Sequence, residues 1–245
     1  MAICNDIKRG TVVMGEIKRL PGERIAQKQD IFAAYKQGLS EYGLDFEKLL
    51  VAKQVHGNTV LTATCKDAEP QMTERGMVIT PKFECDGLIS RNVGLIIGVV
   101  TADCLPILLY SHDSSVVAAV HAGWRGLASG IVARAVRKMG VDASGVSAYI
   151  GTAICQKCFE VGPEVADEFT SSFGQEISKY IAHGRKDRMH VDLTAIAVHE
   201  LRSSGVLDVN ISQSQDCTCC NPDKYWSHRK HGLQRGNQLT FIALQ

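Results

Sequence analysis

The chain has 245 residues, of which 45% are hydrophobic and 22% are charged, a composition typical of a globular protein with a buried core. Its 27 basic and 26 acidic side chains nearly cancel, so the chain lacks the positive charge that nucleic-acid or anionic-membrane binding usually requires. These values argue against disorder and favour a small-molecule partner. The length suits one large domain, and we expect a single catalytic domain over residues 1–245.

The N-terminal segment carries Asp6, Lys8 and Arg9 where a secretory signal would need an uninterrupted apolar stretch, so we expect a cytoplasmic protein. The longest apolar run, residues 93–110, contains Asp103, which is costly in hydrocarbon, and so predicts buried strands rather than a membrane span. Nine cysteines, an odd number, favour free thiols, metal ligands or catalysis over a disulfide framework.

The first sixty residues predict one strand, one helix and one turn. Residues 11–14 are an apolar strand candidate, and the apolar spacing over 30–42, stopped by a glycine, is typical of a helix. Two apolar runs then flank Gly57 and Asn58. This pair predicts a turn between two strands, with His56 at the end of the first of them.

The middle of the chain predicts the core sheet. Three runs are continuous rather than alternating in their apolar residues, at 87–90, 94–100 and 106–110. Continuous apolar runs are typical of strands covered on both faces, so we expect these strands to be buried. A further buried strand at 116–120 is followed by a helix expected over 127–139, with Gly140 as its stop signal.

The last hundred residues continue the alternation of strands and helices. We expect a strand at 146–151, a helix over 159–173, a loop or lid at 174–190, an amphipathic helix over 191–205 and a final strand at 239–244. The chain shows no internal repeat, low-complexity tract or linker. A single α/β or α+β domain is therefore the economical interpretation.

Three residues at the ends of apolar strands could share a metal ion: His56, Cys104 and His121. A sheet-based fold can bring side chains together at strand ends without crowding its core. Two imidazoles and a thiolate with one position left open suit catalytic zinc, which polarises a substrate oxygen or lowers the pKa of bound water to about 7. The spacing alone is not a motif, so a buried thiol and two satisfied histidines remain the alternative.

Two neighbouring features could serve the same site. Asp103 precedes Cys104 and could orient a ligand histidine or cap a turn. The sequence GWRG at residues 123–126 opens a helix, where free N–H groups and the fork of Arg125 could hold phosphate or carboxylate. It lacks the spacing of a P-loop or of a dinucleotide fingerprint, so a tight turn with a packed tryptophan and a solvated arginine is the alternative.

A second cluster of possible ligands consists of cysteines late in the chain: Cys155, Cys158, Cys217, Cys219 and Cys220. Four of these five thiols could close a structural zinc site, since cysteines two residues apart are typical of zinc knuckles. The two groups are far apart in sequence, however, and could belong to different layers of the fold.

The histidines late in the chain leave two interpretations open. His228 and His231, with Arg229 and Lys230, could contact substrate or could form a solvated basic turn. The remaining histidines have no candidate ligand as a neighbour and are expected to be surface or packing residues: His112, His183, His190 and His199.

Four blocks of sequence resemble successive signatures of the laccase-domain family. They are KQVHGNTV at 53–60, CDGLISRNVGLIIGVVTADCLPILLY at 85–110, VAAVHAGWRGLASGI at 117–131 and GTAICQKCFEVGPEV at 151–165. The blocks occur in the right order, and HAGWRG after TADC is specific. The family was first described as multicopper polyphenol oxidoreductases and is now assigned as purine nucleoside phosphorylases with adenosine deaminase activity.

The resemblance implies a single domain of mixed β-sheets sandwiched between helices, with a zinc ion held by His56, Cys104 and His121. Asp103 and Arg125 are further catalytic candidates. The implied substrates are purine nucleosides and phosphate: adenosine, inosine and methylthioadenosine would give free base and ribose 1-phosphate, and adenosine would also be deaminated. We expect a monomer or a homodimer.

Two other activities use the same residues. Two histidines and a cysteine also suit Cu²⁺, as in a polyphenol oxidase, but none of the eight histidines forms the His-x-His pair from which a trinuclear copper centre is built. A cysteine hydrolase would use Cys104 with a histidine base and no metal.

The sequence departs from the family pattern in several places, among them the late Gly-Arg, which is Gly236 and Asn237 here. The N-terminal Gly-Gly-Val-Ser stretch of the family has no clear match in residues 9–40. Its Gly-Pro-Cys-Cys is replaced by CQKC at 155–158, and its late Ser-Tyr-Arg-Arg by SHRK at 227–230. These segments would hold the nucleoside, so the changes bear on substrate preference more than on metal binding.

Overall fold

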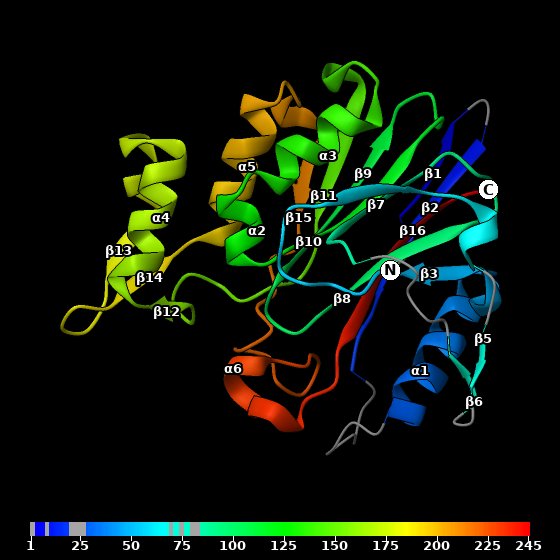
Figure 1. The fold of residues 1–245 in the computed structure, drawn as a ribbon, viewed down its shortest axis with the longest axis horizontal. Helices are drawn as coiled ribbons and strands as arrows, with labels where there is room; N and C mark the ends of the chain where they lie inside the picture. Colours follow the sequence, from blue (N-terminus) through cyan, green and yellow to red (C-terminus); the bar gives the residue numbers. More distant parts are fainter. Residues whose placement is uncertain (1–2, 8–9, 20–27, 69–70, 74–75, 79–83) are drawn as a thin grey trace.

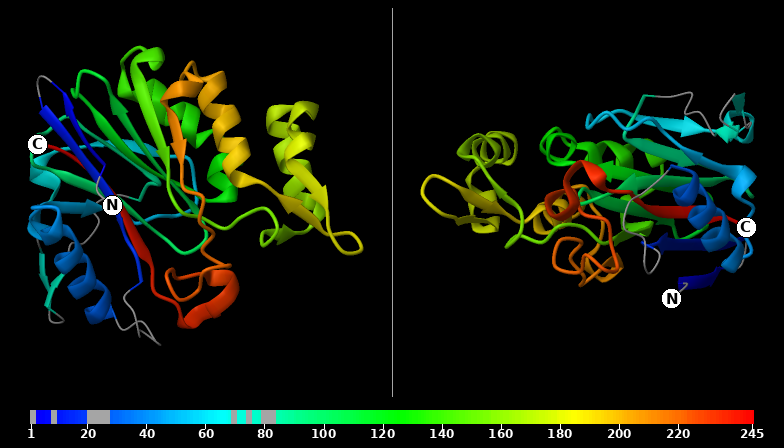
Figure 2. Two further views of the ribbon diagram at one scale, coloured as in Figure 1. Left: turned by 180° about the vertical axis from the view of Figure 1, so that it is seen from behind. Right: turned by 90° about the horizontal axis from the view of Figure 1, so that it is seen from below.

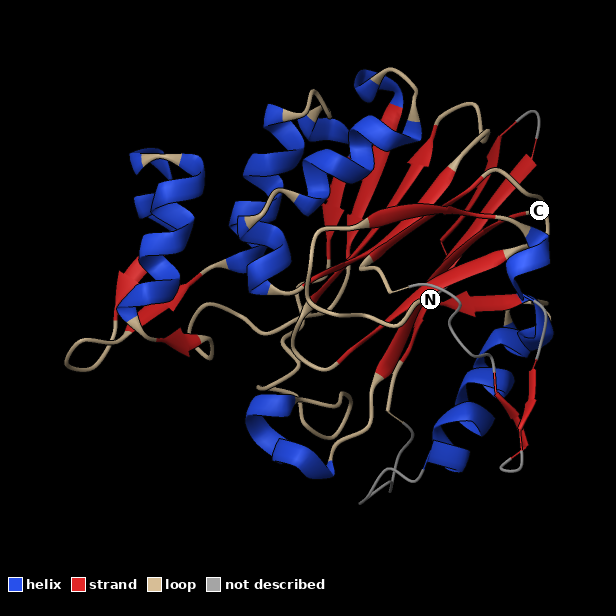
Figure 3. Ribbon diagram, in the orientation of Figure 1, coloured by secondary structure: helices blue, strands red, loops and turns tan. Residues whose placement is uncertain are grey.

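Two β-sheets lie face to face at the centre of the computed structural model, and helices cover the outer face of each sheet (Figures 1 and 3). The structure describes residues 3–7, 10–19, 28–68, 71–73, 76–78 and 84–245. Among these, no helix has the length and apolar character needed to cross a membrane.

The first sheet brings the two ends of the chain together. Its five strands follow the order β1 (Ile3–Ile7), β2 (Gly10–Ile17), β16 (Gln238–Leu244), β8 (Ile96–Thr101) and β3 (Leu49–Val51). All pairs are antiparallel except β3 with β8. The outer face of this sheet is covered by helix α1 (Lys28–Glu41), from which Tyr35 and Leu39 pack against Phe241 and its neighbours.

The second sheet carries most of the core strands. Its six strands follow the order β15 (Ile211–Gln213), β11 (Val146–Ile150), β9 (Leu105–Ser111), β10 (Val117–Ala122), β7 (Gly87–Ser90) and β4 (Val60–Ala63). Two of its pairs, β4 with β7 and β11 with β15, are parallel, so both sheets are mixed. Its outer face is covered by α2 (Trp124–Ala128), α3 (Ile131–Met139) and α5 (Leu193–Ser203).

The continuous apolar runs are explained by this four-layer arrangement. In β9, Ile107 contributes to the layer under the helices, whereas Leu108 packs between the two sheets. In β8, Ile97 packs between the sheets and Ile96 faces the layer of α1. Each strand therefore buries both of its faces. The predicted fold of mixed sheets sandwiched between helices is confirmed.

Two predicted helices have different bounds. The expected helix over 127–139 begins earlier, at Trp124, and is divided into α2 and α3, because Gly130 adopts a left-handed conformation with φ 75° between them. The helix expected over 159–173 starts only at Pro163, as α4 (Pro163–Phe173), since residues 160–161 form the short strand β12 (Glu160–Val161).

The segment 174–190 is folded rather than an irregular loop or lid. It forms the short 3-10 helix η4 (Gln175–Tyr180) and the strands β13 (Ile181–His183) and β14 (Met189–Val191). These strands pair with β12 in a separate sheet of order β12-β14-β13. Figures 1 and 2 show that this sheet and α4 project together from the main body.

The remaining described elements are short. They are η1 (Phe46–Lys48), η2 (Cys65–Ala68), β5 (Gln71–Thr73), β6 (Gly76–Val78), η3 (Ala143–Gly145), η5 (Asp208–Asn210), α6 (His228–His231) and η6 (Gly232–Gln234). The helix α6 lies in the segment that leads into β16 (Figure 1).

Candidate metal centre

The chain passes twice from the first sheet to the second, and each crossing carries one of the predicted metal ligands. His56 lies between β3 and β4, and Cys104 lies between β8 and β9. His121 belongs to β10 in the second sheet. The expected turn at 57–58 therefore does not join two paired strands, because β3 and β4 belong to different sheets.

The three side chains meet at one end of the sandwich. One ligand atom from each lies within 4.8 Å of the other two. The rings of His56 and His121 are nearly perpendicular, with centroids 4.8 Å apart, and the Cys104 thiol is hydrogen-bonded to both imidazoles. His121 is buried, Cys104 is partly exposed and His56 is exposed. The cluster is therefore open to solvent on the side of His56.

Both crossings contain a non-glycine residue with positive φ. The angle is 61° at His56 and 96° at Asp103, which precedes Cys104. Such conformations cost of the order of 1–3 kcal/mol and persist where the surrounding structure fixes them, often at functional sites. Here they occur where the chain turns from one sheet into the other and presents a side chain to the cluster.

Asp86, a buried carboxylate that was not among the predicted site residues, links two of the three side chains of this cluster. One of its oxygens lies 2.8 Å from Nδ1 of His121, and its carboxylate accepts the backbone N–H groups of Val55, His56 and Gly57 at 3.3, 2.9 and 2.7 Å. It therefore fixes the ring of one histidine and the backbone of the other. An acidic residue directly before the buried strand 87–90 was the available signal.

The electrostatics of the cluster favour the thiolate form of Cys104. Burial raises the pKa of this thiol, but hydrogen bonds and charge interactions with His121 and His56 outweigh burial and lower the pKa to about 6. Burial likewise opposes protonation of His121, whereas Asp86 and Cys104 together raise its pKa to about 9. Without a metal ion, these interactions favour the thiolate form of Cys104 and the protonated form of His121.

The donor set fits a zinc ion. A thiolate and two imidazole nitrogens are ligands that Zn²⁺ prefers, and three protein ligands with one open position are typical of a catalytic rather than a structural site. Because Nδ1 of His121 is bonded to Asp86, its Nε2 is the nitrogen left for a metal, the arrangement in which a carboxylate orients a ligand histidine.

Asp103 does not play the orienting role that was one of its two predicted functions. Its carboxylate accepts hydrogen bonds from the hydroxyl of Thr218 at 2.6 Å and from the backbone N–H of Arg229 at 2.7 Å. Arg229 lies in the first turn of α6, so Asp103 caps that helix from a distant part of the chain. Asp86 is the residue that orients a histidine.

The start of α2 lies directly against the cluster. A Cβ added to Gly123 would be 3.0 Å from the His56 ring and 3.5 Å from the Cys104 sulfur, so the glycine permits this close approach. Two residues later, Arg125 is exposed, and its guanidinium stacks 4.3 Å above the ring of Trp124. Arg125 is therefore accessible to an anion from solvent.

The basic segment around α6 lies at the surface but is bonded to other parts of the fold. Arg229 donates to the backbone carbonyls of Cys158 and Glu160, both at 2.9 Å. The centroid of the His231 ring lies 5.4 Å from that of the Trp226 ring. Its Nδ1 lies 3.1 Å from the backbone N–H of Ser227. The exposed members of the segment are His228, Arg229 and Lys230.

Among the described residues, two groups have the geometry to hold a metal ion. One is the cluster of two histidines and Cys104, and the other consists of four of the late cysteines: Cys155, Cys158, Cys217 and Cys220. The histidines expected to be surface or packing residues belong to neither group: His112, His183, His190 and His199.

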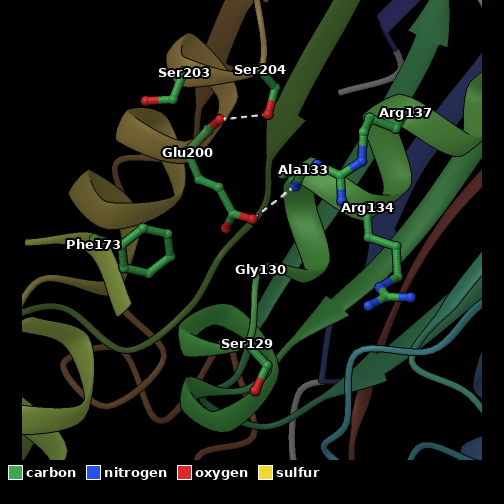
Figure 4. Close-up of a pocket in the computed structure, with 9 residues that line it drawn as sticks. All are labelled: Ser129, Gly130, Ala133, Arg134, Arg137, Phe173, Glu200, Ser203 and Ser204. Carbon is green, nitrogen blue, oxygen red and sulfur yellow. Dashed lines mark hydrogen bonds between the residues drawn. The ribbon is translucent and has the colours of Figure 1, made fainter. Parts of the chain in front are cut away.

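A separate pocket of about 440 Å³ lies between α3 and α5. Figure 4 shows Glu200 of α5 reaching across it to accept a hydrogen bond from the backbone N–H of Ala133, at 2.8 Å. Arg134 and Arg137 of α3 also line this pocket. It includes none of the three residues of the candidate metal centre.

The chain is similar to known enzymes. Residues 23–245 match the model of the family described as multi-copper polyphenol oxidoreductase laccase. The chain is 32% identical over 205 residues to Adenosine deaminase RL5 from an unknown prokaryotic organism, which covers 82% of this chain and 77% of that protein. It is 33% identical over 192 residues to Purine nucleoside phosphorylase YfiH of Escherichia coli K12, covering 78% and 72%.

Solved structures share the fold. A crystal structure of the hypothetical protein YfiH of Bacillus licheniformis superimposes with a TM-score of 0.80 at 24% identity, covering 96% of this chain and 92% of that chain. A crystal structure of YlmD from Geobacillus stearothermophilus also gives a TM-score of 0.80, at 23% identity, covering 96% and 90%.

Proposed function

The chain belongs to the multi-copper polyphenol oxidoreductase laccase family, and we propose that it is a zinc-dependent purine nucleoside phosphorylase that also deaminates adenosine. The observation that carries this proposal is the cluster of His56, Cys104 and His121, open on one side and adjoining the start of α2. The names of the curated relatives, adenosine deaminase and purine nucleoside phosphorylase, agree with it.

The protein's own residues prepare the proposed metal position. Asp86 fixes the His121 ring and the backbone at His56, and the low pKa of Cys104 supplies the thiolate at neutral pH. When bound, zinc would supply Lewis-acid polarisation of a substrate oxygen or activation of a water molecule. The exposure of His56 leaves a side of the site from which a nucleoside can enter.

Phosphorolysis also requires a place for the incoming phosphate. The guanidinium of Arg125 presents paired N–H donors suited to a phosphate, and its stacking on Trp124 limits its orientations. The start of α2 lies beside the cluster, with Gly123 as its N-terminal cap. Deamination would use the same open side with water as the nucleophile in place of phosphate.

Phenol oxidation by a multicopper centre has less support. A multicopper oxidase that reduces oxygen to water needs a trinuclear cluster of histidines besides its cysteine-containing copper site. In the part of the chain that the structure describes, two groups of side chains could bind a metal ion. One of them contains two histidines, and the other contains none. We therefore place oxidase chemistry behind nucleoside chemistry, in spite of the family's description.

The test is incubation of the purified protein with adenosine, inosine and methylthioadenosine, with and without phosphate, followed by identification of the products. We expect phosphate-dependent release of free base with ribose 1-phosphate, and conversion of adenosine to inosine without phosphate. Cys104→Ala and His56→Ala should abolish both. Cys65→Ala, at an exposed cysteine outside both metal groups, is the control.

Three outcomes would contradict the proposal, each in a different way. Wild-type release of hypoxanthine from inosine by Cys104→Ala or His56→Ala would show that the cluster is not the active site. Activity that survives chelation but is lost on thiol alkylation would identify a cysteine hydrolase. Oxygen uptake with a phenol, without nucleoside turnover, would identify an oxidase.

A further inference from the structure

Four cysteines gather where two neighbouring strands of the second sheet end. One loop follows β11 and carries Cys155 and Cys158, and the other follows β15 and carries Cys217 and Cys220. Because β11 and β15 are parallel neighbours, both loops leave the sheet at the same end. The pairing continues past the strands through a parallel bridge between Ala153 and Cys217.

The sulfur atoms are close enough to share one ion. The four Sγ atoms all lie within 4.8 Å of one another, and those of Cys158 and Cys220 are 3.4 Å apart. A tetrahedral zinc ion with Zn–S bonds of about 2.3 Å separates its sulfurs by about 3.8 Å. Small side-chain adjustments would therefore close the site.

The spacing of the four ligands is the same in both loops. Cys155 and Cys158 are separated by two residues, and so are Cys217 and Cys220. Two C-x-x-C pairs from separate turns are the ligand pattern of structural zinc sites with four cysteines. The fifth cysteine of this region, Cys219, lies outside the group and packs against the hydrophobic core.

Backbone N–H groups also point at the sulfurs. The N–H of Cys155 donates to the Sγ of Cys217 at 3.2 Å, and the N–H of Cys220 is bonded to the same sulfur. Within the first pair, the N–H of Cys158 is bonded to the Sγ of Cys155. These bonds favour the thiolate of Cys217, whose pKa is lowered, whereas burial raises the pKa of Cys155 and Cys158.

We propose that Cys155, Cys158, Cys217 and Cys220 bind a structural zinc ion, distinct from the centre formed by His56, Cys104 and His121. Each thiol that is still protonated would lose its proton to solvent as its sulfur binds zinc, and no oxidant or reductant takes part. Four protein ligands leave no open position, so this ion stabilises the fold and does not take part in the reaction.

The ion would hold the segments that support Asp103. Thr218 follows Cys217 directly, and its hydroxyl donates to the Asp103 carboxylate. Ile154 precedes Cys155, and its backbone N–H donates to the Asp103 carbonyl at 3.0 Å. Arg229 is bonded both to that carboxylate and to the carbonyl of Cys158. Loss of the structural ion would therefore loosen the crossing that presents Cys104, although none of the three candidate ligands is touched.

The first experiment measures zinc content in proteins purified without added metal. We expect Cys220→Ser, at an exposed position, to carry about one zinc ion per chain less than the wild type. Cys219→Ser, at the next residue of the same loop, should keep the full content. Equal zinc content in Cys220→Ser and in the wild type would overturn the proposal.

A second measurement does not depend on the folding of a ligand variant. Cys104→Ala disables the other centre, so titration of its metal-free form with Co²⁺ under reducing conditions reports on the four cysteines alone. We expect the intense visible and charge-transfer absorption of a tetrahedral tetrathiolate site. Absence of that spectrum would overturn the proposal, as would peptide mapping that found the four cysteines joined as disulfides in freshly purified, zinc-free protein.

The two zinc proposals can fail separately. If Cys104→Ala lost no zinc while Cys220→Ser did, the structural site would stand and the proposed catalytic metal would fall. The opposite pattern would remove the structural site and leave the catalytic one. The double variant Cys104→Ala/Cys220→Ser is expected to bind neither ion.

Discussion

Asp86 and His121 form a buried hydrogen bond of 2.8 Å between a carboxylate oxygen and Nδ1. The same carboxylate accepts the backbone N–H of His56, on the crossing from the first sheet to the second. One side chain thus determines the position of two of the three candidate ligands.

Replacing Asp86 by asparagine would keep its shape and remove its charge. We expect metal affinity at the cluster to fall by about 10–100-fold, the usual effect of changing a group that orients a ligand histidine. A competition titration against a chromophoric chelator would measure it, with Asp113→Asn, at an exposed turn, as the control. Unchanged affinity would show that the cluster does not depend on this carboxylate.

Gly123→Ala is a steric test of the contact between α2 and the cluster. The backbone at this glycine, φ −65° and ψ 160°, suits alanine, so the added methyl group acts mainly through its contact with the His56 ring at 3.0 Å. We expect metal affinity to fall by about tenfold with little change in overall stability. Gly145→Ala, where a Cβ meets nothing within 4 Å, should leave affinity unchanged.

If Gly123→Ala bound metal as the wild type does, the close approach of α2 would not constrain the ligands. The thermal unfolding midpoint of each variant distinguishes a local effect from a general loss of structure.

Arg125→Ala separates the two proposed reactions. Losing a charged hydrogen-bond donor of about 1.5–3 kcal/mol should raise the KM for phosphate by roughly 10–100-fold. Adenosine deamination uses no phosphate and should change little. Arg125→Lys should recover only part of the loss, because lysine lacks the bidentate fork. Steady-state kinetics with varied phosphate would measure this effect, and Arg134→Ala on α3 is the control.

An equal loss of phosphorolysis and deamination in Arg125→Ala would contradict this assignment. The arginine would then act on the nucleoside or on the fold rather than on phosphate.

Glu200 is expected to make stability depend on pH. Burial raises the pKa of this carboxyl from 4.5 to about 7. Backbone hydrogen bonds from Ala133 and Val132 and the positive charge of Arg137 act in the opposite direction and lower the pKa. The folded protein then binds more protons than the unfolded chain between these values, so stability falls as pH rises from about 4.5 to 7. The loss amounts to at most about 3 kcal/mol.

Glu200→Gln removes the ionisation while keeping an oxygen that can accept the N–H of Ala133. Its unfolding free energy should therefore decline less than that of the wild type between pH 5 and about 8. Denaturant titrations at several pH values would show this, with Glu168→Gln, on the exposed side of α4, as the control. Parallel pH profiles for Glu200→Gln and the wild type would contradict the expectation.

The sequence was sufficient to predict the core strands and that His56, Cys104 and His121 lie close together. Continuous apolar runs marked the buried strands, and Cys104 and His121 stood at their ends. His56 was grouped with them because it too stands at the end of an apolar run, and the resemblance to a known family supports this grouping. What could not be predicted was the route of the chain, since nothing local in residues 49–63 shows that β3 and β4 enter different sheets.

Asp86 and Gly130 show why other features were missed. The role of Asp86 depends on contacts with His121 and with the backbone at His56, far away in sequence, so no local pattern reveals it. The apolar spacing over 127–139 fits one helix, and the left-handed conformation of Gly130 that divides it is set by tertiary packing. The pairing of the two cysteine loops likewise depends on the parallel contact between β11 and β15.

The two crossings at His56 and Cys104 connect the metal site to the unfolding of the protein. A metal ion held by these residues and by His121 would link the two sheets. Its ligands come from both connections between the sheets and from the second sheet itself. A chain in which one sheet has detached would have no complete centre. Catalysis would therefore be confined to fully assembled molecules, and partly unfolded ones would release their metal together with their activity.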